Sequence, residues 1–169
     1  MLAIDDDTFL DFYEEPKVIE GDLIWKHVGE GRLAIKDVNI ISNILPDKEI
    51  KLFCKQNIYN DFAFIIVYYG EERKELVKYD KRPHPPSFID KCTKIPIREP
   101  HKHKFKEGYP NGCRYIIPND EIDRVDVNKA IFQFLKECNI LLLGEYEKLS
   151  PLRYQSLLHD FSNMGGTKT

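Results

Sequence analysis

Several features that mark particular classes of protein are missing from this sequence. No run of residues approaches the roughly 20 consecutive apolar positions that a membrane-spanning helix needs. The first residues, MLAIDDDTFLDFYEEP, are acidic, whereas a signal peptide begins with basic and then apolar residues. We therefore expect a cytoplasmic protein with no membrane partner.

Cysteine is scarce, and its four copies lie far apart without a C-x-x-C pair: Cys54, Cys92, Cys113 and Cys138. A secreted disulfide framework is usually denser and belongs to a smaller chain, so we expect reduced thiols. The sequence also lacks a Gly-rich phosphate loop and the signatures of zinc fingers, helix-turn-helix proteins and RRM domains.

What is present is the composition of an ordinary globular domain. The 169 residues are 42% hydrophobic, 12% aromatic and 31% charged, with no internal repeat and no low-complexity linker. A chain of this length buries a sufficient core without metal or disulfide support. We expect a single domain over residues 1–169.

The patterning predicts an α+β fold. Alternating or continuously apolar segments favour strands at 22–28, 32–38, 49–54, 62–69, 75–79, 101–106 and 113–117, and Tyr109–Gly112 has the composition of a turn. Helical spacing predicts a short helix over 9–13, one over 127–138 capped by Asp126, and one over 150–164. We therefore expect an acidic N-terminal segment (1–21), an antiparallel β-meander sheet (22–118) and a helical C-terminal part (119–164) packed on one face of that sheet.

Charge is unevenly distributed, although the net charge is only −3. Residues 1–30 contain nine Asp or Glu against two Lys or Arg, whereas residues 73–114 contain twelve Lys or Arg against five Asp or Glu. A local cationic field attracts anions even when the whole protein is mildly acidic. The basic middle therefore predicts either an anion-binding surface or the solvated faces of a hairpin, and the acidic start could mask it.

Three of the five histidines fall in that basic middle. In a strand, successive side chains alternate between faces, so His101, His103 and Phe105 of HKHKFK should share one face and the three lysines the other. Side chains two positions apart on one face lie about 7 Å apart, close enough for two imidazoles to act on one group. His84 lies between prolines that restrict its backbone.

This histidine cluster leads us to predict a metal-independent ribonuclease of toxin or phage-defence type. One of the catalytic candidates His84, His101 and His103 would take a proton from the ribose 2′-hydroxyl, and another would protonate the leaving 5′-oxygen. A cation would offset the charge that builds on the phosphoryl oxygens. The residues predicted to contact nucleic acid are Arg82, Lys102, Lys104, Lys106, Tyr109 and Arg114.

Three other interpretations use the same segment. The basic residues could belong to a non-catalytic module that binds nucleic acid or a protein in a defence or mobile-element complex. His-x-His with Cys92 or Cys113 could hold a structural zinc ion, although we expect no cofactor. His101 and His103 could also be sheet residues hydrogen-bonded to their neighbours, with only a structural role.

The central segment also resembles a known family. The runs that carry the resemblance are YDKRPHPP (79–86), PHKHKFKEGYPNGCRYIIP (100–118) and FLKECNI (134–140). They are similar to a bacterial and archaeal domain-of-unknown-function family with a P-H … H-x-H-x-[YF]-x-E-G-[YF] motif and, more distantly, to TumE-like toxins of toxin–antitoxin systems. In that resemblance the motif positions are taken by His84, His101, His103, Glu107 and Gly108. The toxin resemblance implies an RNA-directed role and a protein antitoxin partner.

Overall fold

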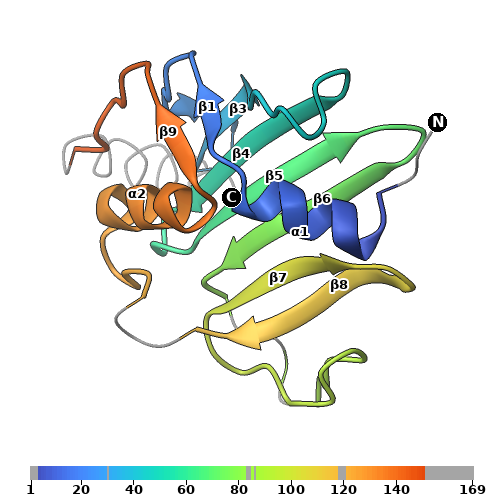
Figure 1. Cartoon of the computed structure of the whole chain (residues 1–169). Coiled ribbons are helices and arrows are strands. Elements are labelled where there is room, and N and C mark those ends of the chain that lie inside the picture. Colours follow the sequence, from blue (N-terminus) through green and yellow to red (C-terminus); the bar gives the residue numbers. More distant parts are fainter. Residues whose placement is uncertain (1–3, 30, 83–84, 86, 118–120, 151–169) are drawn as a thin grey trace.

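The computed structural model describes residues 4–29, 31–82, 85, 87–117 and 121–150, and Figure 1 shows their arrangement. Two helices lie in this part of the chain, α1 (Asp6–Glu14) and α2 (Val127–Glu137). The strands are β1 (Lys17–Ile19), β2 (Lys26–His27), β3 (Arg32–Asn39), β4 (Glu49–Asn57), β5 (Phe62–Tyr69), β6 (Arg73–Asp80), β7 (His101–Lys106), β8 (Tyr109–Ile116) and β9 (Ile140–Leu142).

The main sheet is an antiparallel meander in the order β2-β3-β4-β5-β6-β7-β8, so every strand pairs with its neighbour in sequence. This confirms the predicted α+β class. β1 and β9 form a separate parallel pair, which was not predicted because three-residue strands have almost no periodicity. β9 also interrupts the C-terminal part that was expected to be helical.

One face of the sheet carries the hydrophobic core, and α1 and α2 both lie in front of that face in Figure 1. Phe64 of β5 and Phe134 of α2 have ring centroids 5.5 Å apart, and both side chains are fully buried. Burial of one such side chain stabilises the fold by about 1.5–3 kcal/mol. Within the described part of the chain, no helix lies against the opposite face.

Both described helices begin at the residues that helix-capping chemistry favours. The Asp5 carboxylate accepts a hydrogen bond from the Thr8 N–H, and the Asp126 carboxylate accepts from the N–H groups of Asn128 and Lys129. The predicted cap at Asp126 is thereby confirmed. Neither helix has the length and apolarity that a membrane span requires. The helix predicted over 150–164 lies outside the described residues, apart from Ser150.

The strand predicted over 22–28 is wrong in extent. Only Lys26–His27 forms a regular strand, and Leu23 forms an isolated bridge to Tyr146. Trp25 is fully buried and its indole N–H donates to the Tyr146 hydroxyl, so tertiary contacts replace ladder hydrogen bonds here. The strand predicted from residue 49 is correct in position and extends to Asn57.

The turn between β7 and β8 also differs from the prediction. It consists of Glu107 and Gly108, while Tyr109–Gly112 belongs to β8. Gly108 and Gly112 both have positive φ, at 80° and 64°. A Cβ on Gly112 would lie 2.3 Å from the Lys104 carbonyl oxygen, so this position requires glycine. The pairing of β7 with β8 shifts between Lys104 and Lys106, as at a β-bulge.

The expectation of four reduced cysteines is wrong for one pair. Cys92, in the β6–β7 connection, forms a disulfide with Cys113 of β8, with the two Cα atoms 5.2 Å apart. The sequence separation of 21 positions hides this proximity, because the β6–β7 connection must fold back on β8 before the two sulfur atoms meet. Cys54 and Cys138 are free and buried, and burial raises the pKa of both thiols.

Candidate nucleic-acid interface

β7 divides its charged side chains between the two faces of the sheet. His101 pairs with Asp80 and His103 with Lys78, while Lys102 pairs with Tyr79, whose ring lies in the core. The predicted alternation therefore holds from residue 101 to 104. It is wrong for Phe105, which packs against Phe9 of α1 at 5.6 Å because the bulge rotates it to the helix face.

The two histidines of β7 form a stacked, buried pair. Their ring centroids are 4.9 Å apart and their planes are inclined by 27°. His101 is 0% exposed and His103 is 7% exposed. His101 Nδ1 lies 2.9 Å from the Glu99 carbonyl oxygen, within hydrogen-bonding distance. The rings therefore have the burial of structural sheet residues, and neither presents a surface that a phosphodiester could reach.

The surroundings of His103 keep its imidazole neutral. Burial lowers the pKa of His103 to about 3, and the neighbouring Arg114, His101 and Lys78 lower it further against a small opposing effect of Asp80. A general acid must carry a proton at the working pH. At neutral pH His103 does not, so it lacks the protonated form that one of the two catalytic roles requires.

On the helix face, Lys102 lies in a buried network of opposite charges. Its Nζ donates to Glu121 Oε1 at 2.5 Å and to Glu137 Oε1, and the Tyr13 hydroxyl also donates to Glu137 Oε1 at 2.9 Å. Lys104 lies over the Tyr13 ring at 4.4 Å. Lys102 is 7% exposed, so it is not available to contact nucleic acid as the sequence predicted.

The acidic N-terminal segment lies against this basic strand. Lys106 forms an ion pair with Asp6 of α1, and the Glu107 N–H donates to the Asp6 carboxylate at 2.8 Å. α1 thus neutralises part of the positive charge of β7, as the charge distribution suggested. Phe9 and Phe12 of the same helix are buried in the core, so the helix also contributes to stability.

The face opposite the helices presents a different set of cations. Strand pairing places side chains there in two transverse rows, the first being Ala34, Lys55, Ala63, Asp80 and His101, and the second Phe53, Ile65, Lys78, His103 and Arg114. Neighbouring strands lie about 4.8 Å apart, so charges within a row are close. The term cationic face denotes six basic side chains on this side: Arg32, Lys36, Lys55, Lys78, Arg82 and Arg114. Lys26, which pairs with Ala34, and Lys51 of β4 lie on the same side but outside this set.

Two carboxylates hold part of this face in place. Asp80 lies 3.3 Å from Lys78 Nζ and 3.9 Å from Arg82 Nε, and Asp90 lies 3.0 Å from Arg114 Nη1. Burial alone would raise the pKa of Asp90, but hydrogen bonds from Thr93 and Arg114 outweigh it and lower the pKa to about 2. Asp90 therefore stays ionised and joins the β6–β7 connection to β8.

The remaining predicted residues are scattered. Arg82 and Arg114 belong to the cationic face, whereas Tyr109 lies at the β7–β8 turn beside the β5–β6 turn. His84 lies outside the described residues. Cys92 and Cys113 are bonded to each other, so neither offers a thiolate ligand in this structure. Among the described residues, no three His, Cys, Asp or Glu side chains are grouped as metal ligands.

Sequence reasoning missed Arg32, Lys36, Lys55 and Lys78. The signal was present in β4, where Ile50, Leu52 and Cys54 alternate with Lys51, Phe53 and Lys55. A lysine on the outer side of each of several successive strands indicates a basic sheet face. The clustered histidines drew the prediction instead to β7.

Comparison with protein-family models, with curated proteins and with solved structures finds no match to this chain. The resemblance to a motif family and to TumE-like toxins therefore stays a prediction.

Proposed function

We propose that this protein is a non-catalytic module that binds the phosphate backbone of RNA on its cationic face, in the cytoplasm. The observation that supports this function is the strand register that places Lys55 and Lys78 on one face, where Lys36 lines the same pocket as Lys55. Contacts between lysine or arginine and phosphates supply most of the affinity in sequence-independent binding. Half-buried Phe53 lies in the same transverse row as Lys78 and adds an apolar surface for sugars and bases.

The test is fluorescence anisotropy with a labelled mixed-sequence RNA of 12 nucleotides at several salt concentrations. The variant Lys36→Met, Lys55→Met, Lys78→Met removes three charges but keeps the apolar stems that cover the sheet. We expect it to bind at least tenfold more weakly and to lose about 0.7 of the salt slope per lysine that contacts a phosphate.

The matched control removes three exposed lysines elsewhere, Lys129→Met, Lys136→Met and Lys148→Met. It changes the net charge equally, so it should retain the wild-type salt slope and nearly the wild-type affinity. Equal weakening in both variants would mean that RNA responds only to net charge, and the proposed surface would be wrong.

Ribonuclease activity is the second candidate, because two stacked imidazoles lie beside Arg114 and Lys78. We rank it below binding because both rings are buried and His103 is neutral. The same RNA incubated in excess EDTA tests it directly. Cleavage that leaves 2′,3′-cyclic ends and is lost in His101→Ala, His103→Ala would replace the binding proposal. A protein antitoxin would then be the expected partner.

A further inference from the structure

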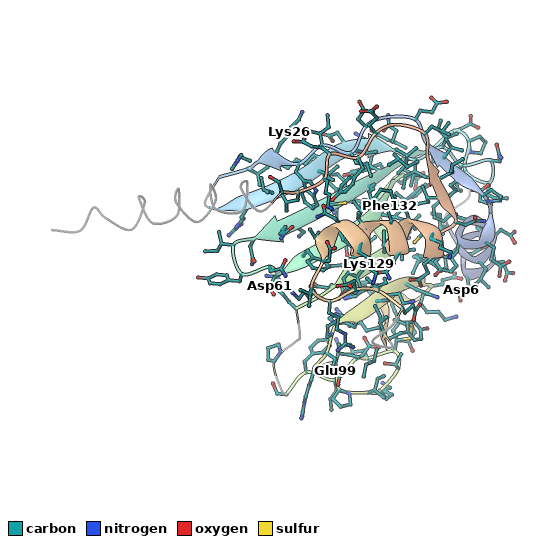
Figure 2. The ribbon with its side chains drawn as sticks, turned by 90° about the vertical axis from the view of Figure 1, so that its left-hand side faces the viewer. Asp6, Lys26, Asp61, Glu99, Lys129 and Phe132 are labelled. Atoms are coloured by element: carbon teal, nitrogen blue, oxygen red, sulfur yellow. A yellow bond between two sulfur atoms is a disulfide. The ribbon has the colours of Figure 1, made fainter. Side chains whose placement is uncertain are left out.

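The cationic face contains a pocket of about 320 Å³ at one end of strands β3, β4 and β5. Among the described residues, four cationic side chains and one carboxylate line it: Arg32, Lys36, Lys55, Arg82 and Asp61. Figure 2 shows Asp61 on the opposite side of the molecule from Asp6 of α1. The acidic helix that neutralises part of β7 is therefore remote from this pocket.

The pocket exists because small residues lie beneath long ones. Ala34 and Ala63 pair with Lys55 from either side, so two short side chains flank one lysine in the same row. Both alanines also line the pocket. Longer basic side chains from neighbouring positions form its walls, which leaves a hollow whose floor is apolar and whose rim is cationic.

Two of the charges around the hollow, Lys36 and Lys55, form no ion pair with the described residues, whereas Arg82 is paired with Asp80. Partial burial, together with the like charges of Lys78 and Arg82, lowers the pKa of Lys55 against the opposing effects of Asp80 and Glu75. An anion in the pocket would relieve this repulsion, so the unliganded site favours binding of negative charge.

We propose that this pocket binds a phosphomonoester, the terminal phosphate of an RNA strand. A phosphomonoester carries up to two negative charges near neutral pH and three acceptor oxygens, whereas an internal phosphodiester carries one charge. A pocket in which Lys36 and Lys55 have no ion-pair partner among the described residues therefore favours the terminal group. The volume suits about one nucleotide. The proposal rests on RNA binding by the cationic face and names the group that face selects.

The test compares three forms of one RNA dodecamer, with a 5′-phosphate, with a 3′-phosphate and with hydroxyl groups at both ends. Anisotropy gives a Kd for each, and calorimetry measures binding of adenosine monophosphate and of inorganic phosphate alone. We expect one phosphorylated form to bind at least tenfold more tightly than the hydroxyl form.

Two variants connect this preference to the pocket. Lys55→Met should abolish it, and Ala63→Leu, which fills the hollow without changing charge, should do the same. The matched control is Lys51→Met, on the same strand and the same face. Lys51 lies 2.7 Å from Glu49 and outside the pocket, so its loss should leave the preference intact. Thermal melting identifies any variant that fails to fold. If Ala63→Leu fails to fold, Lys55→Met still tests the pocket.

The outcomes separate this inference from the proposed function. Equal affinity for all three RNA forms would overturn the phosphomonoester pocket while leaving backbone binding in place. Binding of adenosine monophosphate that Lys55→Met abolishes, without RNA binding, would support the pocket as a site for a free nucleotide and overturn the RNA proposal. No binding of any probe would overturn both.

Discussion

At the residue scale, His103 makes the stability of the folded protein depend on pH in a specific way. Its pKa is about 3 in the folded state against an ordinary value of 6.5. Between those values the unfolded chain binds a proton that the folded protein does not, so stability rises with pH from about 3 to 6.5 and falls on acidification. The contribution is of the order of a few kcal/mol.

His103→Gln should therefore lose less stability than the wild type between pH 6.5 and 4. Urea denaturation at a series of pH values measures the free energy of unfolding for both proteins. His27→Gln, at an exposed histidine, should keep the wild-type profile. Parallel profiles for wild type and His103→Gln would show that the imidazole is not buried as described.

Lys102 provides a second test at this scale. Lys102→Met would leave Glu137, whose side chain is 16% exposed, without its cation, while Glu121 at 38% is partly solvated. Removing one partner of a fully buried ion pair costs about 3–5 kcal/mol, and the solvated partner reduces this to about 2 kcal/mol. Chemical denaturation measures this loss in the free energy of unfolding. The control variant Lys136→Met, at an exposed lysine, should lose almost none. A neutral effect of Lys102→Met would contradict the network.

At the element scale, the sequence was sufficient for strands with strong patterns and for helix caps. The continuously apolar β5, the alternating β4 and the Asp126 cap follow from local chemistry, and the structure confirms them. The rotation of Phe105 could not be predicted, because it depends on a glycine in the partner strand that contacts the Lys104 carbonyl. The Cys92–Cys113 disulfide likewise depends on tertiary folding of the β6–β7 connection.

That disulfide leads to a prediction about the element it anchors. Closing a loop of this length stabilises a protein by about 3 kcal/mol, mainly by restricting the unfolded chain. Dithiothreitol should therefore lower the melting temperature of the wild type, measured by circular dichroism. The double variant Cys92→Ser, Cys113→Ser should have the lower melting temperature from the start, and dithiothreitol should not change it. An unchanged melting temperature of the wild type would contradict the disulfide.

At the scale of the whole molecule, the two faces of one sheet have different roles. The helices, the aromatic core and the Lys102 network lie on one face, and the cationic face lies on the other. The histidines that the sequence singled out lie in β7 at the border of that face, buried rather than exposed. Charge clustering pointed to residues 73–114, whereas the register of the meander brings Lys55, from outside that segment, onto one face with Lys78.

The measurement that tests this account most directly is the salt dependence of RNA binding. The account predicts that Lys36→Met, Lys55→Met, Lys78→Met reduces the slope of log Kd against log salt concentration by about 2, whereas Lys129→Met, Lys136→Met, Lys148→Met leaves it unchanged. Equal slopes for wild type and the first variant would contradict the assignment of the cationic face as the RNA-binding surface.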